Sequence, residues 1–138
     1  LSKYYFTDIG LRNALLDFRQ TEQTHIMENV IYNELLYRGY SVDVGIVEVT
    51  GHDKNGKFIR KQLEVDFVVN DGSQRYYIQS AFSIPDEEKM SQETASFRYI
   101  DDSFKKILVV KDDIMPYTDD NGFLHIGLFD FLLKPQMM

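Results

Sequence analysis

The sequence contains no cysteine among its 138 residues. This absence excludes disulfide bonds and thiolate metal sites and fits a reducing compartment, so we expect a cytoplasmic protein. The three histidines are far apart and lack the ligand spacing typical of a zinc site. No apolar run approaches the roughly 20 residues that a helix needs to cross a bilayer, and the first residues show no basic-then-apolar leader. We therefore expect no membrane partner.

A broad basic surface is also missing. The chain has 15 Lys and Arg residues against 22 Asp and Glu residues, which gives a formal net charge of −7 and a pI near 4.9. Non-specific binding to nucleic acid depends on clusters of cations that neutralise phosphates. Any contact with DNA is therefore expected to be local or to need support from another domain.

The remaining composition is typical of one globular domain. Hydrophobic residues make up 43% of the chain and aromatic residues 14%, which is enough for a substantial core at this length. Residues 1–138 are therefore predicted to form a single domain. Because the chain begins at Leu1 rather than at methionine, we also expect it to be an excised portion of a longer protein.

The order of local patterns predicts an α/β fold. Capping residues, apolar periodicity and turn signals predict helices over about 8–18 and 25–38, strands over 41–49, 64–69 and 75–82, a helix over about 85–99, strands over 106–110 and 123–126, and a helical turn over 128–133. The segment 112–122 is predicted to be a loop. Such an order indicates a mixed sheet flanked by helices.

The most informative stretch is a predicted hairpin around Asp71-Gly72. This dipeptide lies between runs of β-branched and aromatic residues, and both central positions of a type I′ turn need positive φ. With Asp71-Gly72 as the two-residue loop, Asp66 pairs with Tyr77 and Glu64 pairs with Gln79. Asp66 and Gln79 are then diagonal neighbours, close enough to share one cation or one water network.

Period-two alternation assigns the hairpin side chains to two faces. The face predicted to join the core carries Leu63, Val65, Phe67, Val69, Tyr76, Ile78, Ser80 and Phe82. The opposite face, where chemistry is expected, carries Glu64, Asp66, Tyr77, Gln79 and Ala81. A register slip of one residue would move every side chain of a strand to the other face.

Four segments of the chain together resemble a known family. They are residues 4–13 (YYFTDIGLRN), 25–35 (HIMENVIYNEL), 64–67 (EVDF) and 77–79 (YIQ). They resemble the C-terminal domain of a large group of bacterial and archaeal AAA+-type ATPases, a domain of unknown function that is similar to PD-(D/E)XK nucleases. The resemblance covers nearly the whole chain and implies a restriction-endonuclease-like fold. It also implies an ATPase module before residue 1, since no Gly-x-x-x-x-Gly-Lys-Ser/Thr motif for ATP occurs within this chain.

The resemblance implies that an acid from an early helix joins the hairpin residues. Glu28 and Asp66 match the acidic positions, which in an active nuclease hold one or two Mg²⁺ ions. Gln79 stands where the second hairpin acid is expected, and Ala81 stands where the lysine is expected. An amide oxygen is a weaker Mg²⁺ ligand than a carboxylate, and an alanine side chain offers nothing to the reaction.

Two functions from different classes remain open at this point. In the first, the chain is a catalytically inactive, nuclease-like accessory domain that acts through its ATPase module, another protein or weak DNA binding. In the second, it is a Mg²⁺-dependent DNA nuclease with Glu28 and Asp66 as metal ligands, Gln79 as a supporting amide, and Arg38 or Lys61 as a displaced cation. A purely structural role is the alternative for each site residue, because buried polar groups need hydrogen-bond partners.

Overall fold

The computed structural model describes residue 5 and residues 23–138. Its elements are, in chain order, α2 (Gln23–Tyr37), β1 (Ser41–His52), β2 (Phe58–Asp71), β3 (Gln74–Ala81), α3 (Glu87–Glu93), α4 (Ala95–Arg98), β4 (Lys105–Val110), β5 (Tyr117–Thr118), β6 (Leu124–Gly127), α5 (Leu128–Leu133) and the 3-10 helix η1 (Pro135–Met137). The helix predicted over 8–18 lies outside the described residues. None of the helices just named is long and apolar enough to span a membrane.

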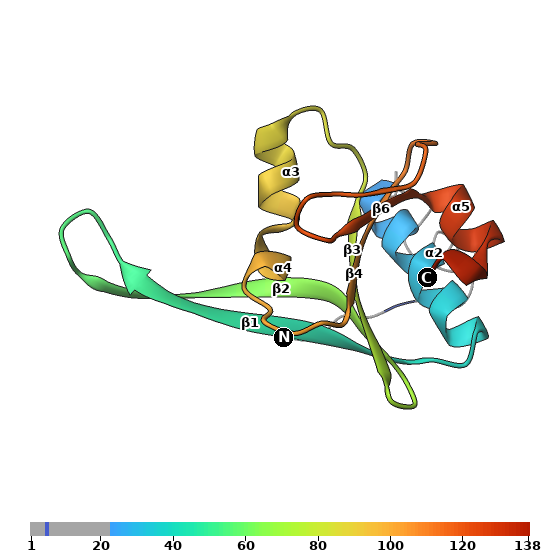
Figure 1. Cartoon of the computed structure of the whole chain (residues 1–138), viewed down its shortest axis with the longest axis horizontal. Helices are drawn as coiled ribbons and strands as arrows, with labels where there is room; N and C mark the ends of the chain where they lie inside the picture. The colour runs from blue at the N-terminus through green and yellow to red at the C-terminus, as the bar shows by residue number, and fades with distance from the viewer. Residues whose placement is uncertain (1–4, 6–22) are drawn as a thin grey trace, which may run out of the picture.

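The strands form one six-stranded sheet in the order β1-β2-β3-β4-β6-β5. Pairing is antiparallel between β1 and β2, β2 and β3, and β5 and β6, and it is parallel between β3 and β4 and between β4 and β6. Helices lie on both sides of this sheet (Figure 1). The predicted α/β fold with a mixed sheet flanked by helices is therefore confirmed.

Helices α2 and α5 cover one face of the sheet. Met27, Ile31 and Leu35 recur at helical spacing along α2 and are all buried. With Phe131 of α5 they pack on the sheet residues Phe67, Val69, Ile78, Ile107, Val109, Leu124 and Ile126. Helix α2 ends where Gly39 adopts a φ of 85°, the left-handed conformation that glycine takes at helix C-termini.

Helices α3 and α4 lie over the other face. The single helix predicted over about 85–99 is interrupted at Thr94, whose hydroxyl donates to the carbonyl of Met90 at 2.8 Å. Asp86 caps α3, since its side chain accepts from the backbone N–H of Lys89 at 2.8 Å. Two buried clusters lie on this face: Val65, Tyr77, Phe97 and Phe123, and then Ala81, Leu108 and Val110.

The predicted loop over 112–122 contains the short strand β5, which pairs with β6. Its return turn is held by Asp119, whose Oδ1 accepts from the backbone N–H groups of Asn121 and Phe123 at 2.9 and 3.0 Å. Gly122 completes this turn with a φ of 84°. A strand of two residues has too short an alternation to be recognised from sequence.

The β2–β3 hairpin differs from its predicted register by two residues. Asp71 pairs with Gln74 and Val68 pairs with Tyr77, so the loop is Gly72-Ser73. The predicted pairs of Asp66 with Tyr77 and of Glu64 with Gln79 are therefore wrong. Gly72 has a φ of 61° and supplies the positive φ that the first position of such loops needs. Asp71 is therefore the last residue of β2 and not the first residue of the loop.

A β-bulge in β2 also changes the predicted faces. Asp43 pairs with Val68 and Gly45 pairs with Val65, so Asp66 and Phe67 together oppose one residue of β1. Such a bulge shifts the alternation by one residue and bends the strand. The prediction that residues 65 and 67 share one face is therefore wrong.

The consequence is visible in the packing on either side of the bulge. Val65 packs with Tyr77 on the α4 face, whereas Phe67 packs under α2. Gly45 allows the strands to approach here, because an added Cβ would lie 2.6 Å from Cγ2 of Val68 and 3.2 Å from Cβ of Val65.

Candidate functional site

The predicted site residues Asp66 and Gln79 meet where the ladder between β2 and β3 ends. The last backbone pair is Phe67 with Ile78, one residue before them. Oε1 of Gln79 accepts a hydrogen bond from the backbone N–H of Asp66 at 2.9 Å. Oδ2 of Asp66 accepts one from the backbone N–H of Ser80 at 2.8 Å. We call this pair of bonds the Asp66–Gln79 link, and it continues the strand pairing with side chains.

Burial makes the Asp66–Gln79 link important for stability. Asp66 is 8% exposed and Ser80 is 5% exposed. A backbone N–H buried to this degree needs an acceptor, and a carboxylate is a stronger acceptor than a neutral oxygen. The arrangement therefore gives both side chains a structural role in joining two strands.

Glu28 lies on α2 between the buried residues Met27 and Asn29, and its own side chain is half-buried. It belongs to the helix that packs on the Phe67 side of the sheet. Within residue 5 and residues 23–138, no group of three or more His, Cys, Asp or Glu side chains is placed to hold a metal ion. The predicted metal ligands are two carboxylates, those of Glu28 and Asp66, and this site stays a prediction.

The position expected to carry lysine is apolar. Ala81 is 3% exposed and packs in a cluster with Leu108 and Val110. Partly buried hydrophobic side chains complete the surroundings: Ile84, Met90 and Ile114. A lysine here would have to displace packed side chains, and overpacking of this kind typically costs about 1–3 kcal/mol. The local packing is therefore adapted to a methyl group.

The two cations considered as replacements lie elsewhere. Arg38 pairs with Glu34 at 3.2 Å, donates to the carbonyl of Phe131, and lies 4.8 Å over the ring of that residue. It thus ties α2 to α5. Lys61 is exposed on β2, five residues from Asp66 and so roughly 16 Å away along the strand.

A buried lysine that the sequence analysis missed lies on β4. Lys106 is 7% exposed and its Nζ donates to Oδ1 of Asp102 at 3.1 Å, to the carbonyl of Asp102 at 3.0 Å and to that of Phe104 at 3.0 Å. The hydroxyl of Tyr77 donates to Oδ2 of Asp102 at 2.6 Å. Three acceptors match the three donors of an ammonium group, so this lysine is fully engaged.

Electrostatics fix the protonation states of this group. Burial raises the pKa of Tyr77, and the hydrogen bond to Asp102 raises it further. Burial alone would raise the pKa of Asp102, but hydrogen bonds from Tyr77, Lys106 and the backbone of Phe104 leave it below its ordinary value. Tyr77 is therefore neutral and Asp102 is charged around neutral pH, and neither is suited to exchange a proton there.

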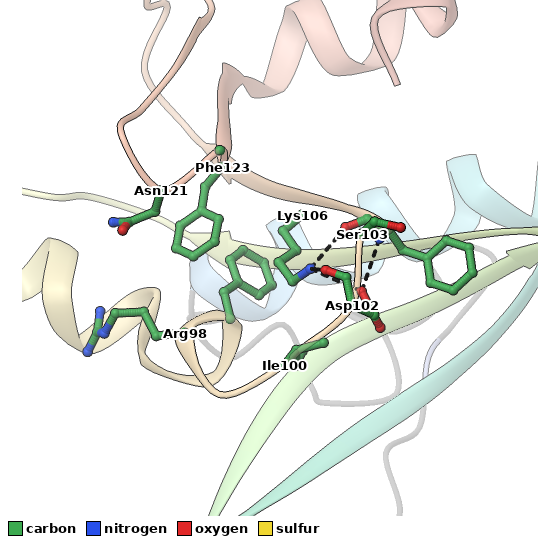
Figure 2. Close-up of a pocket in the computed structure, with 10 residues that line it drawn as sticks. Arg98, Ile100, Asp102, Ser103, Lys106, Asn121 and Phe123 are labelled. Atoms are coloured by element: carbon green, nitrogen blue, oxygen red, sulfur yellow. Dashed lines mark hydrogen bonds and ion pairs between the residues drawn. The ribbon is translucent and has the colours of Figure 1, made fainter.

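The same group borders a pocket of about 550 Å³ (Figure 2). Figure 2 shows Lys106 and Asp102 directed toward each other, with Arg98 and Asn121 at the other end of the pocket. Aromatic walls come from Phe97, Phe104 and Phe123. The lining also includes the polar side chains of Arg98, Ser103 and Asn121. Lys106 and Asp102 bond to each other and to the backbone, so these two side chains act in holding the pocket wall together.

A second polar pair, His125 with Asp119, connects β6 to the loop after β5. His125 is 2% exposed, its Nε2 lies 2.7 Å from Oδ2 of Asp119, and its ring stacks on Tyr117 with centroids 4.4 Å apart. Burial alone would raise the pKa of Asp119, but hydrogen bonds from His125 and two backbone N–H groups lower it. The stacked and buried ring acts in packing the sheet edge.

Comparisons with known proteins leave the activity open. No family model matches the chain, and no solved structure matches it. A curated protein of Haemophilus influenzae, described as an uncharacterized protein, is 32% identical over 133 residues. The match covers 96% of this chain and 29% of that relative, so the chain spans less than a third of the relative's length.

Proposed function

We propose that the chain is a nuclease-like accessory domain of a longer AAA+-type ATPase and that it has no catalytic activity of its own. It acts through contact with the ATPase module or another protein, or through weak DNA binding. The Asp66–Gln79 link carries this proposal, because two of the three predicted site residues, Asp66 and Gln79, each accept a hydrogen bond from the backbone of the neighbouring strand.

The donor set also fits Mg²⁺ poorly. Mg²⁺ favours carboxylate oxygens in near-octahedral geometry, and a nuclease needs a cation to stabilise developing charge. Gln79 offers a neutral oxygen that already accepts a hydrogen bond, and Ala81 offers a buried methyl group. Among the described residues, Lys106 is the buried lysine, and its three donors are engaged by Asp102 and Phe104.

Membership in a longer protein is supported by the Haemophilus influenzae relative, since most of its length lies outside the match. We propose that the corresponding part of this protein's parent contains the phosphate-binding loop for ATP. We also propose a cytoplasmic location, which the absence of cysteine supports. These proposals predict that residues 1–138, added in trans, associate with the remainder of the parent and change its rate of ATP hydrolysis. Neither association nor a change in rate would contradict them.

A titration with Mg²⁺ or Mn²⁺ tests the absence of a metal site. A cation present at a hundredfold excess over its Kd, bound to the folded state alone, stabilises by about 2.7 kcal/mol. For this chain length that is a rise of about 9 °C in Tm. We expect wild type, Asp66→Asn and the control Asp120→Asn, whose carboxylate is exposed, to show the same small shift.

Cleavage of supercoiled DNA completes this test. We expect no nicking above the level of the Asp66→Asn variant in either metal. A large rise in Tm that Asp66→Asn abolishes and Asp120→Asn retains, together with nicking by wild type, would instead establish the metal-dependent nuclease.

A further inference from the structure

The outer half of the β1–β2 hairpin is a two-stranded ribbon that extends beyond the rest of the molecule (Figure 1). Strand β2 pairs with β3 only from Phe67 to Asp71, whereas its pairing with β1 continues to Phe58. We call residues 47–63 the arm. At about 3.3 Å per residue, its part from Leu63 to Phe58 is roughly 17 Å long.

The tip of the arm, residues 52–61, is basic although the chain is acidic. It contains four of the 15 Lys and Arg residues but one of the 22 Asp and Glu residues. The four cations are Lys54, Lys57, Arg60 and Lys61, and all are exposed. None of them forms an ion pair with another residue in the described part of the chain. The tip is therefore a local, uncompensated positive patch.

The acid of the tip, Asp53, has a structural role in the turn. Its Oδ1 accepts from the backbone N–H groups of Asn55 and Lys57 at 2.9 and 2.8 Å. The backbone N–H of Asp53 donates to the carbonyl of Lys57 at 2.9 Å, and Gly56 closes the turn with a φ of 77°. The carboxylate is thus directed at the backbone, and the cations are displayed on a defined hairpin.

In the β2 part of the tip, residues 58–61, each face carries one cation and one exposed apolar side chain. Cross-strand partners share a face and successive residues alternate, so Phe58 and Arg60 lie on one face and Ile59 and Lys61 on the other. Phe58 is 58% exposed and Ile59 is 44% exposed. Exposed apolar groups interleaved with cations favour a partner that has both anionic and apolar surface.

We propose that the arm binds double-stranded DNA, with its cations against the phosphates and Phe58 or Ile59 directed into a groove. Cation–phosphate contacts supply most of the affinity in such complexes. A two-stranded ribbon fits the major groove, which is about 12 Å wide, and apolar side chains on ribbons contact base edges or insert between base steps. The inference deepens the proposed function by naming a partner, and it uses no residue of the Asp66–Gln79 link.

Fluorescence anisotropy with a labelled duplex of about 20 base pairs tests the proposal. If all four cations contact phosphates, the affinity of wild type falls about 150-fold between 50 and 200 mM salt. We expect Lys54→Glu/Lys57→Glu to reduce the salt slope by about 2 and the affinity at low salt by tenfold or more. Arg60→Glu/Lys61→Glu, outside the turn, should do the same.

A matched control reverses the charge of two exposed lysines outside the arm. Lys111→Glu/Lys134→Glu makes the same change in net charge, and we expect its affinity to stay within threefold of wild type. Asp66→Asn should also bind like wild type. DNA binding by the arm and the proposed function are therefore tested by separate experiments. Anisotropy tests DNA binding by the arm, whereas the metal titration and the association with the parent test the proposed function.

Several results would overturn the proposal. They are no measurable binding at about 50 mM salt, an equal loss of affinity in the Lys111→Glu/Lys134→Glu control, and tighter binding to single-stranded DNA or RNA of the same length. Sedimentation velocity without DNA supplies a further result. Self-association that Arg60→Glu/Lys61→Glu abolishes would assign the arm to a second copy of the chain instead.

Discussion

Removal of the Asp66 carboxylate should destabilise the protein. In Asp66→Ala the backbone N–H of Ser80, in a residue that is 5% exposed, loses its acceptor. A buried donor left without a partner costs about 1–3 kcal/mol, and loss of packed side-chain atoms adds to this. We expect Asp66→Ala to cost about 2–3 kcal/mol, and Asp66→Asn, which retains an oxygen acceptor, to cost about 1 kcal/mol.

The other half of the Asp66–Gln79 link gives an independent measurement. Gln79→Ala removes the acceptor of the Asp66 N–H. Because Gln79 is only half-buried, water can replace part of the bond, and we expect a loss of about 1 kcal/mol. The double variant should be non-additive by about 0.5 kcal/mol or more, because both bonds join the same two strands.

Thermal and urea unfolding would measure these differences. One kcal/mol corresponds to about 3–4 °C in Tm for this chain length, so Asp66→Ala should melt roughly 7–10 °C below wild type. Asp120→Asn and Gln62→Ala, both at exposed positions, serve as matched controls. A rise in Tm for Asp66→Asn would refute the structural role. It would indicate a carboxylate held at a cost to stability, as is common at functional sites, and would favour the metal site.

Three further predictions concern other parts of the fold. Lys106→Met should lower the free energy of unfolding by about 1–3 kcal/mol in urea titrations, because the acceptors on Asp102 and Phe104 lose their donor. The lowered pKa of Asp102 implies stability that is present above pH 3.8 and lost as the pH falls further, and the raised pKa of Tyr77 implies stability that is lost as the pH rises above 10.0. Asp102→Asn and Tyr77→Phe should each remove one of these losses from the pH profile of Tm. Gly45→Ala should lower Tm by several degrees, since its Cβ would lie 2.6 Å from a neighbouring side chain.

The helices and strands that are long and regular could be predicted from sequence. Met27, Ile31 and Leu35 repeat at helical spacing and Gly39 ends α2, so local signals agreed with the packing. The hairpin loop was predicted one residue early, because Asp71-Gly72 and Gly72-Ser73 both place glycine at a position of positive φ. Local chemistry does not choose between these two registers.

The β-bulge could not be predicted from the strand that contains it. Its cause lies in the partner strand, where Gly45 allows Val65 and Val68 to approach closely. The predicted alternation of faces therefore holds within the residues before Asp66 and within those after it. The two parts are shifted by one residue relative to each other, so Val65 and Phe67 lie on opposite faces. Only the pairing of β1 with β2 carries this information.

The candidate site was predicted in part. The proximity of Asp66 and Gln79 followed from the hairpin, but their backbone partners depend on where the β2–β3 ladder ends. The acceptors of Lys106 are close to it in sequence, but its burial was missed because that depends on Tyr77, which the parallel pairing of β3 with β4 brings beside it. Contacts between strands that are far apart in sequence leave no local pattern to recognise.

The position of the Asp66–Gln79 link explains how a buried acid stabilises this part of the sheet. In chain direction, β2 comes from the arm and begins to pair with β3 only at Phe67, and the β-bulge at Asp66 bends the strand just before that point. The N–H groups of Asp66 and Ser80 would lack ladder partners at such a junction, and the link supplies an acceptor to each. The end of the β2–β3 ladder, the bend in β2 and the buried carboxylate are therefore parts of one arrangement.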